Sequence, residues 1–322
     1  MQSFEEIRNG SYLYVDKTDL IHSLFQNGRM YFLARPDGFG KSLLLSTLES
    51  FFNGKRELFK GLKIMDLEEQ WLKYPVIHLD FSDANYQSLE AFNTSISEKL
   101  SVYEHIWGKD SRDISNSDRF NTLIKNMARK TGKYVVILID EYDKAYYSTD
   151  TKNREQILME MKVFFSVLKT VDAHLRFALI TGKTRFSELD NFYDISLSED
   201  YNTICGFTEE EILNKFSAEM RDLPYDKCNA ANLLSQWCGG YLFSKTGERV
   251  FKTSSLLDIL HTQKIPCTDT AIQRKAVIAR NPMRLPDIPF QNGYLTIQKY
   301  DVPKHLWYLT VPNLEMTVNF HI

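Results

Sequence analysis

Arg35-Pro-Asp-Gly-Phe-Gly-Lys-Ser42 is the stretch that decides the fold. It follows a short apolar run, Met30 to Ala34, and precedes leucines and phenylalanines at helical spacing. A phosphate-binding loop needs inward-pointing N–H groups, a lysine for the β- and γ-phosphates and a hydroxyl for Mg²⁺. Gly40-Lys-Ser42 supplies these groups, although Arg35 replaces the glycine of the strict motif. The stretch predicts a P-loop, and the alternative is an ordinary strand-to-helix turn that contains a lysine.

A second motif lies about one hundred residues further along the chain. Val135 to Ile139 is continuously apolar, as expected of a strand covered on both faces, and Asp140-Glu141 follows it. This is the form of a Walker B motif, in which Asp140 would hold Mg²⁺ through its water shell and Glu141 would act as the general base. The alternative is a pair of acidic residues that ends a strand in a turn.

A third strand, Leu175 to Ile180, ends in Thr181-Gly182. In P-loop ATPases with an additional strand between the P-loop strand and the Walker B strand, this position contacts the γ-phosphate or the water. Thr181 is therefore the candidate sensor, and a plain strand-end threonine is the alternative.

Strand-like and helix-like runs alternate as far as about residue 200 and predict an α/β fold with a mainly parallel sheet. Further strands are expected at Val76 to Phe81 and at Ile195 to Leu197. We predict three regions: a P-loop ATPase core of the additional-strand type (1–205), a helical lid (206–262) and a small mixed α/β module (263–322).

Local signals refine the last two regions. Thr208 is the expected N-cap of a helix, with Glu211 at the capping-box position. Near the end of the sequence, strands are expected at Tyr294 to Gln298 and Trp307 to Thr310, on either side of a turn near Tyr300-Asp301.

The bulk properties exclude several classes of protein. The formal charge of −3 gives no overall attraction to nucleic acid or anionic membrane. Four cysteines without a CxxC pair, and no HExxH, argue against a disulfide framework or a structural zinc site. No secretory signal is visible, and no apolar run reaches the roughly 20 residues that span a bilayer. We expect a cytoplasmic protein that makes no use of a membrane.

Several strings in this sequence resemble the bacterial AAA-ATPase-like family. Besides the loop itself, they are Phe4-Glu-Glu-Ile-Arg8, Tyr14-Val-Asp-Lys-Thr18, Asp140-Glu-Tyr-Asp-Lys144, Ile180-Thr-Gly182, Ile204-Cys-Gly-Phe-Thr-Glu-Glu210, Gly247-Glu-Arg249, Gln291-Asn-Gly-Tyr-Leu-Thr296 and Tyr300-Asp301. The resemblance covers nearly the whole chain and implies a P-loop ATPase domain. It also implies a following PD-(D/E)XK nuclease-like domain, but we expect none within these 322 residues.

The sequence departs from the family pattern in the loop. Asp37-Gly38 stands where two basic residues are expected, so the loop should attract phosphate less strongly. The segment after Thr181 and the stretch between His261 and Pro289 are also shorter than is usual in the family.

Three other groups of residues have two readings each. Arg185 is either a charge donor to the γ-phosphate or, more simply, a surface arginine. Tyr14, Asp16 and Lys17 either contact the base or ribose or pack the N-terminal segment. A basic run either touches a nucleic-acid backbone or forms a solvated helix face; it comprises Arg274, Lys275, Arg280 and Arg284.

The sequence thus predicts an ATP-binding protein that hydrolyses ATP with Mg²⁺. Lys41 would neutralise the phosphates, Ser42 and Asp140 would hold Mg²⁺, Glu141 would orient water and Thr181 would sense the γ-phosphate. The nucleotide-binding residues are Arg35, Pro36, Asp37, Gly38, Phe39, Gly40, Lys41, Ser42 and Leu43. The alternative is a non-hydrolysing nucleotide switch or interaction module, with a protein or nucleic-acid partner and a link to DNA metabolism.

Overall fold

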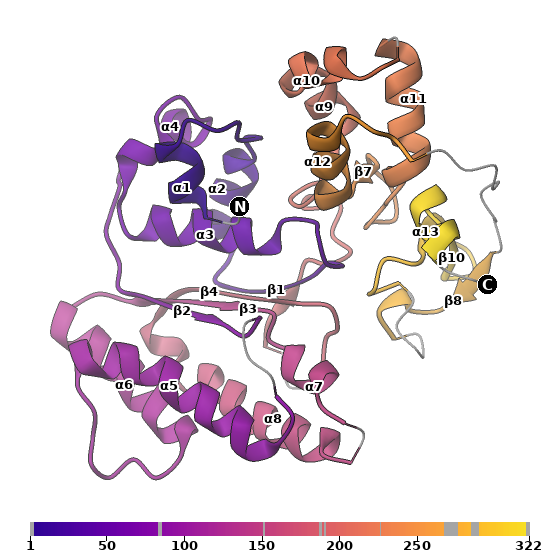
Figure 1. The fold of residues 1–322 in the computed structure, drawn as a ribbon. Helices are drawn as coiled ribbons and strands as arrows, with labels where there is room; N and C mark the ends of the chain where they lie inside the picture. Colours follow the sequence, from indigo (N-terminus) through magenta and orange to yellow (C-terminus); the bar gives the residue numbers. More distant parts are fainter. Residues whose placement is uncertain are drawn as a thin grey trace.

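The computed structural model describes residues 3–82, 86–150, 152–186, 189, 191–225, 227–266, 276–284 and 290–319. Within these residues, a sheet of five parallel strands has the order β2-β3-β4-β1-β5 (Figure 1). The strands are β1 (Met30–Ala34), β2 (Val76–Asp80), β3 (Val135–Asp140), β4 (Leu175–Gly182) and β5 (Tyr193–Asp194). The predicted α/β class with a parallel sheet is confirmed, and β4 lies between β1 and β3.

The pairing register of the strands determines which residues meet at the carboxyl edge of the sheet. All six residues of β3 are buried, which explains their unbroken apolar character. Leu33 lies opposite Thr181, Ile139 lies opposite Ile180, and Asp80 lies opposite Asp140. The carboxyl ends of β1, β3 and β4 therefore meet at one edge, where ligands bind in open α/β sheets.

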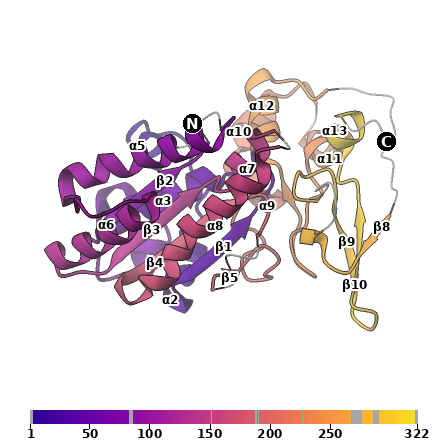
Figure 2. The same cartoon turned by 90° about the horizontal axis from the view of Figure 1, so that it is seen from below.

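Helices cover both faces of the sheet (Figures 1 and 2). One face carries α1 (Phe4–Asn9), α2 (Thr18–Asn27), α3 (Lys41–Phe52) and α4 (Ile64–Leu67); the other carries α5 (Leu89–Trp107), α6 (Asn116–Thr131), α7 (Lys144–Ser148) and α8 (Arg154–Thr170). Aromatic contacts fill both layers, with Phe25 stacked on Phe51 and Phe120 stacked on Phe164. Helix α6 is followed by Gly132, whose left-handed conformation is typical of a helix C-cap.

A second apolar cluster lies outside the sheet, in the orange part of Figure 1. It is built from α9 (Glu209–Lys215), α10 (Ser217–Asp222), α11 (Lys227–Cys238) and α12 (Thr253–Thr262), beside β6 (Phe207–Thr208) and β7 (Val250–Phe251). Thr208 and Glu211 form the predicted capping box at the start of α9. These helices coincide with the predicted helical region, whose role as a lid stays a prediction.

The last described residues form a three-stranded antiparallel sheet and a helix. The elements are β8 (Val277–Ala279), β9 (Thr296–Asp301), β10 (Leu306–Thr310) and α13 (Leu314–Asn319), and short 3₁₀ turns occur at η1 (Arg56–Phe59), η2 (Asp172–His174) and η4 (Pro282–Arg284). The turn expected near Tyr300-Asp301 occupies residues 302–305, directly after these two residues. Asp301 stays in the strand and its carboxylate accepts from the N–H of Lys304, which starts the turn one step later.

The short fifth strand is also displaced from its predicted position. It occupies Tyr193–Asp194 rather than Ile195 to Leu197. The Asp194 carboxylate accepts a hydrogen bond from the N–H of Ser196, and this local turn removes the chain from the ladder. Ile195 is nevertheless fully buried, because its side chain packs into the core.

In the part of the chain that the structure describes, no helix combines the length and apolar character needed to cross a membrane.

A buried ion pair joins α5 to α6. Arg119 donates two 2.8 Å hydrogen bonds to the carboxylate of Glu104, and both side chains are less than 10% exposed. The pair lowers the pKa of Glu104. Removal of one partner would leave the other as an uncompensated buried charge.

Arg119→Met should therefore lower the free energy of unfolding by on the order of 3 kcal/mol, measured by urea denaturation. Arg112→Met is the matched control, because Arg112 pairs with Asp110 on the surface and is 86% exposed. The control should leave the denaturation midpoint unchanged. Equal midpoints for the two variants would show that the buried pair does not stabilise the α5–α6 contact.

Candidate functional site

The segment from Arg35 to Ser42 connects β1 to α3 at the carboxyl edge of the sheet. Gly38 and Gly40 have φ angles of +82° and +97°, in the left-handed region that favours glycine. The N–H of Arg35 donates to the carbonyl of Gly182, which ties the start of the loop to β4. Because α3 begins at Lys41, its first N–H groups face this edge and favour an anion.

Lys41 is buried at the centre of this edge, with 4% of its side chain exposed. Its ammonium donates to the carbonyls of Arg35 (2.9 Å) and Pro36 (3.3 Å) and forms a 2.9 Å ion pair with Glu141. Burial by itself would lower the pKa of Lys41, but the carboxylates of Glu141, Asp37 and Asp140 together raise it. The lysine is therefore charged and folded back over its own loop.

The two carboxylates after β3 have different surroundings. Oδ1 of Asp140 accepts from the hydroxyl of Thr181 (2.5 Å) and from the N–H of Glu141 (3.0 Å). Glu141 has a φ angle of +50°, which is uncommon and strained for a residue with a side chain. This conformation turns the Glu141 carboxylate towards Lys41. The structure thus brings together Lys41, Asp140, Glu141 and Thr181.

Ser42 is half-buried in the first turn of α3, one residue after Lys41. Among the described residues, no group of three or more His, Cys, Asp or Glu side chains could hold a metal ion. Mg²⁺ rarely needs such a group, since it usually takes one or two carboxylates, phosphate oxygens and water. A carboxylate at Asp140 and a hydroxyl at Ser42 are oxygen donors of the kind this ion prefers.

Sequence reasoning gave no role to Asp143, although it lies in the string Asp140 to Lys144. Its side chain is fully buried, and Oδ2 accepts from the N–H groups of Lys183 (2.9 Å) and Thr184 (2.7 Å). Oδ1 has no hydrogen-bond partner. Burial raises the pKa of Asp143 to about 6. Asp143 therefore fixes the turn that follows β4.

The segment that begins at residue 206 contacts the other side of the loop through hydrogen bonds and ring packing. The carbonyl of Gly38 accepts from the N–H of Ser254 at the start of α12, and the carbonyl of Phe39 accepts from the N–H of Gly206. The Phe39 ring packs edge-on against Tyr241 and Phe243, with centroids 4.9 and 5.2 Å away. The side chain of Phe39 thus belongs to the core, and only its backbone faces the loop.

The two arginines near the site are held by the protein itself. The Arg35 guanidinium is 1% exposed, donates to four carbonyls, among them that of Ser196, and lies over the Phe243 ring. Arg185 pairs with Asp194 and donates to the carbonyls of Leu189 and Phe192. Neither guanidinium is directed at Lys41 or Glu141.

The N-terminal residues singled out in the sequence lie beside the loop. Tyr14 and Lys17 line a cavity of about 50 Å³, together with Gly40, Thr47 and Cys205. Lys17 forms an ion pair with Glu211 at 2.7 Å. The Asp16 carboxylate accepts from the backbone and hydroxyl of Thr18, so Asp16 organises the start of α2. Ligand pockets usually exceed about 300 Å³, so this cavity would have to open to admit a base.

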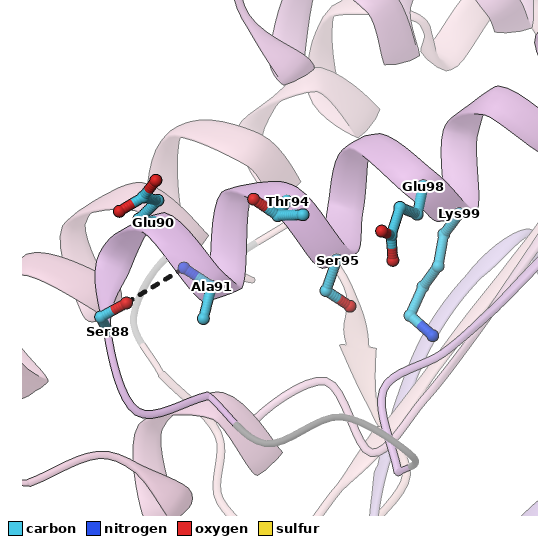
Figure 3. A pocket seen from close by; sticks show the side chains of 7 residues that line it. All are labelled: Ser88, Glu90, Ala91, Thr94, Ser95, Glu98 and Lys99. Atoms are coloured by element: carbon cyan, nitrogen blue, oxygen red, sulfur yellow. Dashed lines mark hydrogen bonds between the residues drawn. The ribbon is translucent and has the colours of Figure 1, made fainter.

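A larger hollow lies along α5 and is shown in Figure 3. Its volume is about 550 Å³, and its lining includes Ser88, Thr94, Glu90, Glu98 and Lys99. Two carboxylates against one lysine give no basis for phosphate binding there. The basic run remains open as a nucleic-acid contact, since Arg274 and Lys275 lie outside the described residues.

Asp143→Asn should flatten the pH dependence of stability between about pH 4 and pH 6. In this window the wild-type folded state retains a proton that the unfolded state has released, so the free energy of unfolding falls as the pH rises. The wild type should lose on the order of 3 kcal/mol relative to the variant between pH 4 and pH 7, measured by urea denaturation. Asp172→Asn, at an exposed carboxylate, is the control; parallel curves for the wild type and Asp143→Asn would contradict the assignment.

Comparison with known proteins agrees with this geometry. A family model described as "Predicted AAA-ATPase" matches residues 1–192, which include the loop, both carboxylates and Thr181. A protein of Azotobacter chroococcum mcd 1, described as "Uncharacterized protein in vnfD 5'region", is 35% identical over 268 residues. The match covers 80% of this chain and about half the length of that relative. By the extent of the family match, this chain belongs to the AAA-ATPase-like family of predicted AAA-ATPases.

Proposed function

We propose that this protein binds ATP with Mg²⁺ at the carboxyl edge of the sheet and hydrolyses it. The observation that carries the proposal is the meeting of Lys41, Asp140, Glu141 and Thr181 beside a loop shaped by left-handed glycines. The extent of the match to the AAA-ATPase-like family supports the same reading.

The phosphates would lie against the backbone of residues 35–43 and the N-terminus of α3. Lys41 would exchange the carbonyls of Arg35 and Pro36 for phosphate oxygens. The base would enter the cavity beside Tyr14 and Lys17, which borders the loop at Gly40. Arg35 and Phe39 would contribute only their backbones, because their side chains are occupied elsewhere.

Ser42 and Asp140 would hold Mg²⁺, which neutralises the developing charge on the phosphates when it is bound. Glu141 would orient the attacking water and accept its proton. In the present structure its carboxylate is paired with Lys41 and is not available for this task. Phosphate that attracts Lys41 would release Glu141, so substrate binding and base activation are coupled.

A second candidate, a nucleotide switch without hydrolysis, is favoured by one observation. The carbonyls of Gly38 and Phe39 are bound by Ser254 and Gly206, so the loop and the helices beyond residue 206 are connected directly. Any rearrangement of the loop on nucleotide binding would move these hydrogen bonds. The switch and the ATPase therefore differ only in whether Glu141 has an active role.

Lys41→Ala should weaken ATP binding in the presence of Mg²⁺ by about 10- to 100-fold, because a charged donor to the phosphates is removed. Isothermal calorimetry would measure the affinity with and without Mg²⁺, and circular dichroism would establish that the variant is folded. Unchanged affinity in a folded variant would reject the loop as the phosphate site.

Glu141→Gln should lower the steady-state rate of phosphate release by about 100-fold or more while ATP still binds, since the amide cannot accept a proton. Glu155→Gln, at an exposed carboxylate on α8, is the matched control and should retain full activity. Wild-type turnover at the background rate, with ATP bound, would favour the switch instead.

A further inference from the structure

A second lysine reaches the loop from the direction of β4. Lys183 directly follows this strand, and its ammonium lies 2.6 Å from Oδ2 of Asp37. Oδ1 of the same carboxylate lies 3.7 Å from the ammonium of Lys41. One loop carboxylate therefore bridges two cations that come from different elements.

The backbone of Lys183 is fixed independently of this pair. Its N–H donates to the buried carboxylate of Asp143, as does the N–H of Thr184. Only 18% of the Lys183 side chain is exposed, which is low for a lysine. Asp143 thus anchors the turn from which Lys183 reaches the loop, whether or not Asp37 is in place.

Asp37 is the most exposed member of this arrangement. Its side chain is 64% exposed, so it can turn into solvent at little cost. Partial burial acts to raise its pKa, but the hydrogen bond from Lys183 and the charge of Lys41 lower it. Asp37 is therefore an anion at neutral pH, and it occupies the position between two lysines that a phosphate oxygen would also occupy.

We propose that Lys183 is a second residue that contacts phosphate. Asp37 pairs with the Lys183 ammonium until the terminal phosphate of a nucleoside triphosphate displaces the Asp37 carboxylate. This inference rests on the proposed function and adds to it a residue and a built-in competitor. Lys183 lies two residues beyond Thr181, on the side of the site where the γ-phosphate would lie. Lys183 therefore distinguishes ATP from ADP, because only ATP carries the γ-phosphate.

The test is a double-mutant cycle of ATP and ADP affinities, measured by calorimetry with Mg²⁺ for the wild type, Asp37→Asn, Lys183→Met and the double variant. Asp37→Asn should tighten ATP binding about tenfold, since a competing charge is removed. In the Asp37→Asn background, Lys183→Met should weaken ATP binding about tenfold or more, and ADP binding by less. Thermal melting establishes that each variant is folded.

Asp172→Asn is the matched control, since Asp172 is an exposed carboxylate that pairs with Arg29 at the opposite end of the sheet. An unchanged ATP affinity when Lys183→Met is added to Asp37→Asn would overturn the inference and leave Lys183 as a partner of Asp37 only. Equal ATP affinity of the wild type and Asp37→Asn would overturn the competition. ATP binding lost in Lys41→Ala but insensitive to both changes would overturn this inference alone; no binding by the wild type or Asp37→Asn would overturn the proposed function too.

Discussion

The ion pair between the buried Lys41 and Glu141 constrains the rest of the site. A buried ammonium is costly unless all its donors are used, and the carbonyls of Arg35 and Pro36 take the other two. The pair closes the loop onto the end of β3, where Glu141 has a left-handed backbone conformation. Any ligand of the loop must therefore compete with groups of the protein for this lysine.

The same loop is bound from its other side by a different part of the chain. Ser254 and Gly206 donate to its carbonyls, and the Phe39 ring is held between Tyr241 and Phe243. The loop is thus enclosed between the sheet edge and the segment of residues 206–254. The hydrogen bonds to Gly38 and Phe39 connect the helices beyond residue 206 to the loop that carries Lys41.

Charges at the sheet edge are balanced within the protein. Asp37 and Glu141 neutralise Lys41 and Lys183, and Asp140 is held by a hydroxyl and an N–H group. A ligand at this edge would have to replace the present partners of the two lysines, rather than enter an empty, positively charged loop. The acidic residue at position 37 contributes directly to that balance.

The sequence by itself determined strands β1 to β4, the glycine loop and the Asp140-Glu141 pair, because these depend on local periodicity and backbone conformation. It did not determine the inward turn of Arg35, because three of its four acceptors lie more than 160 residues away. Nor did it determine the burial of Asp143 or the contact between Lys183 and Asp37. Those features arise only when parallel strands distant in the chain end at the same edge, and that long-range pairing is decided by tertiary packing.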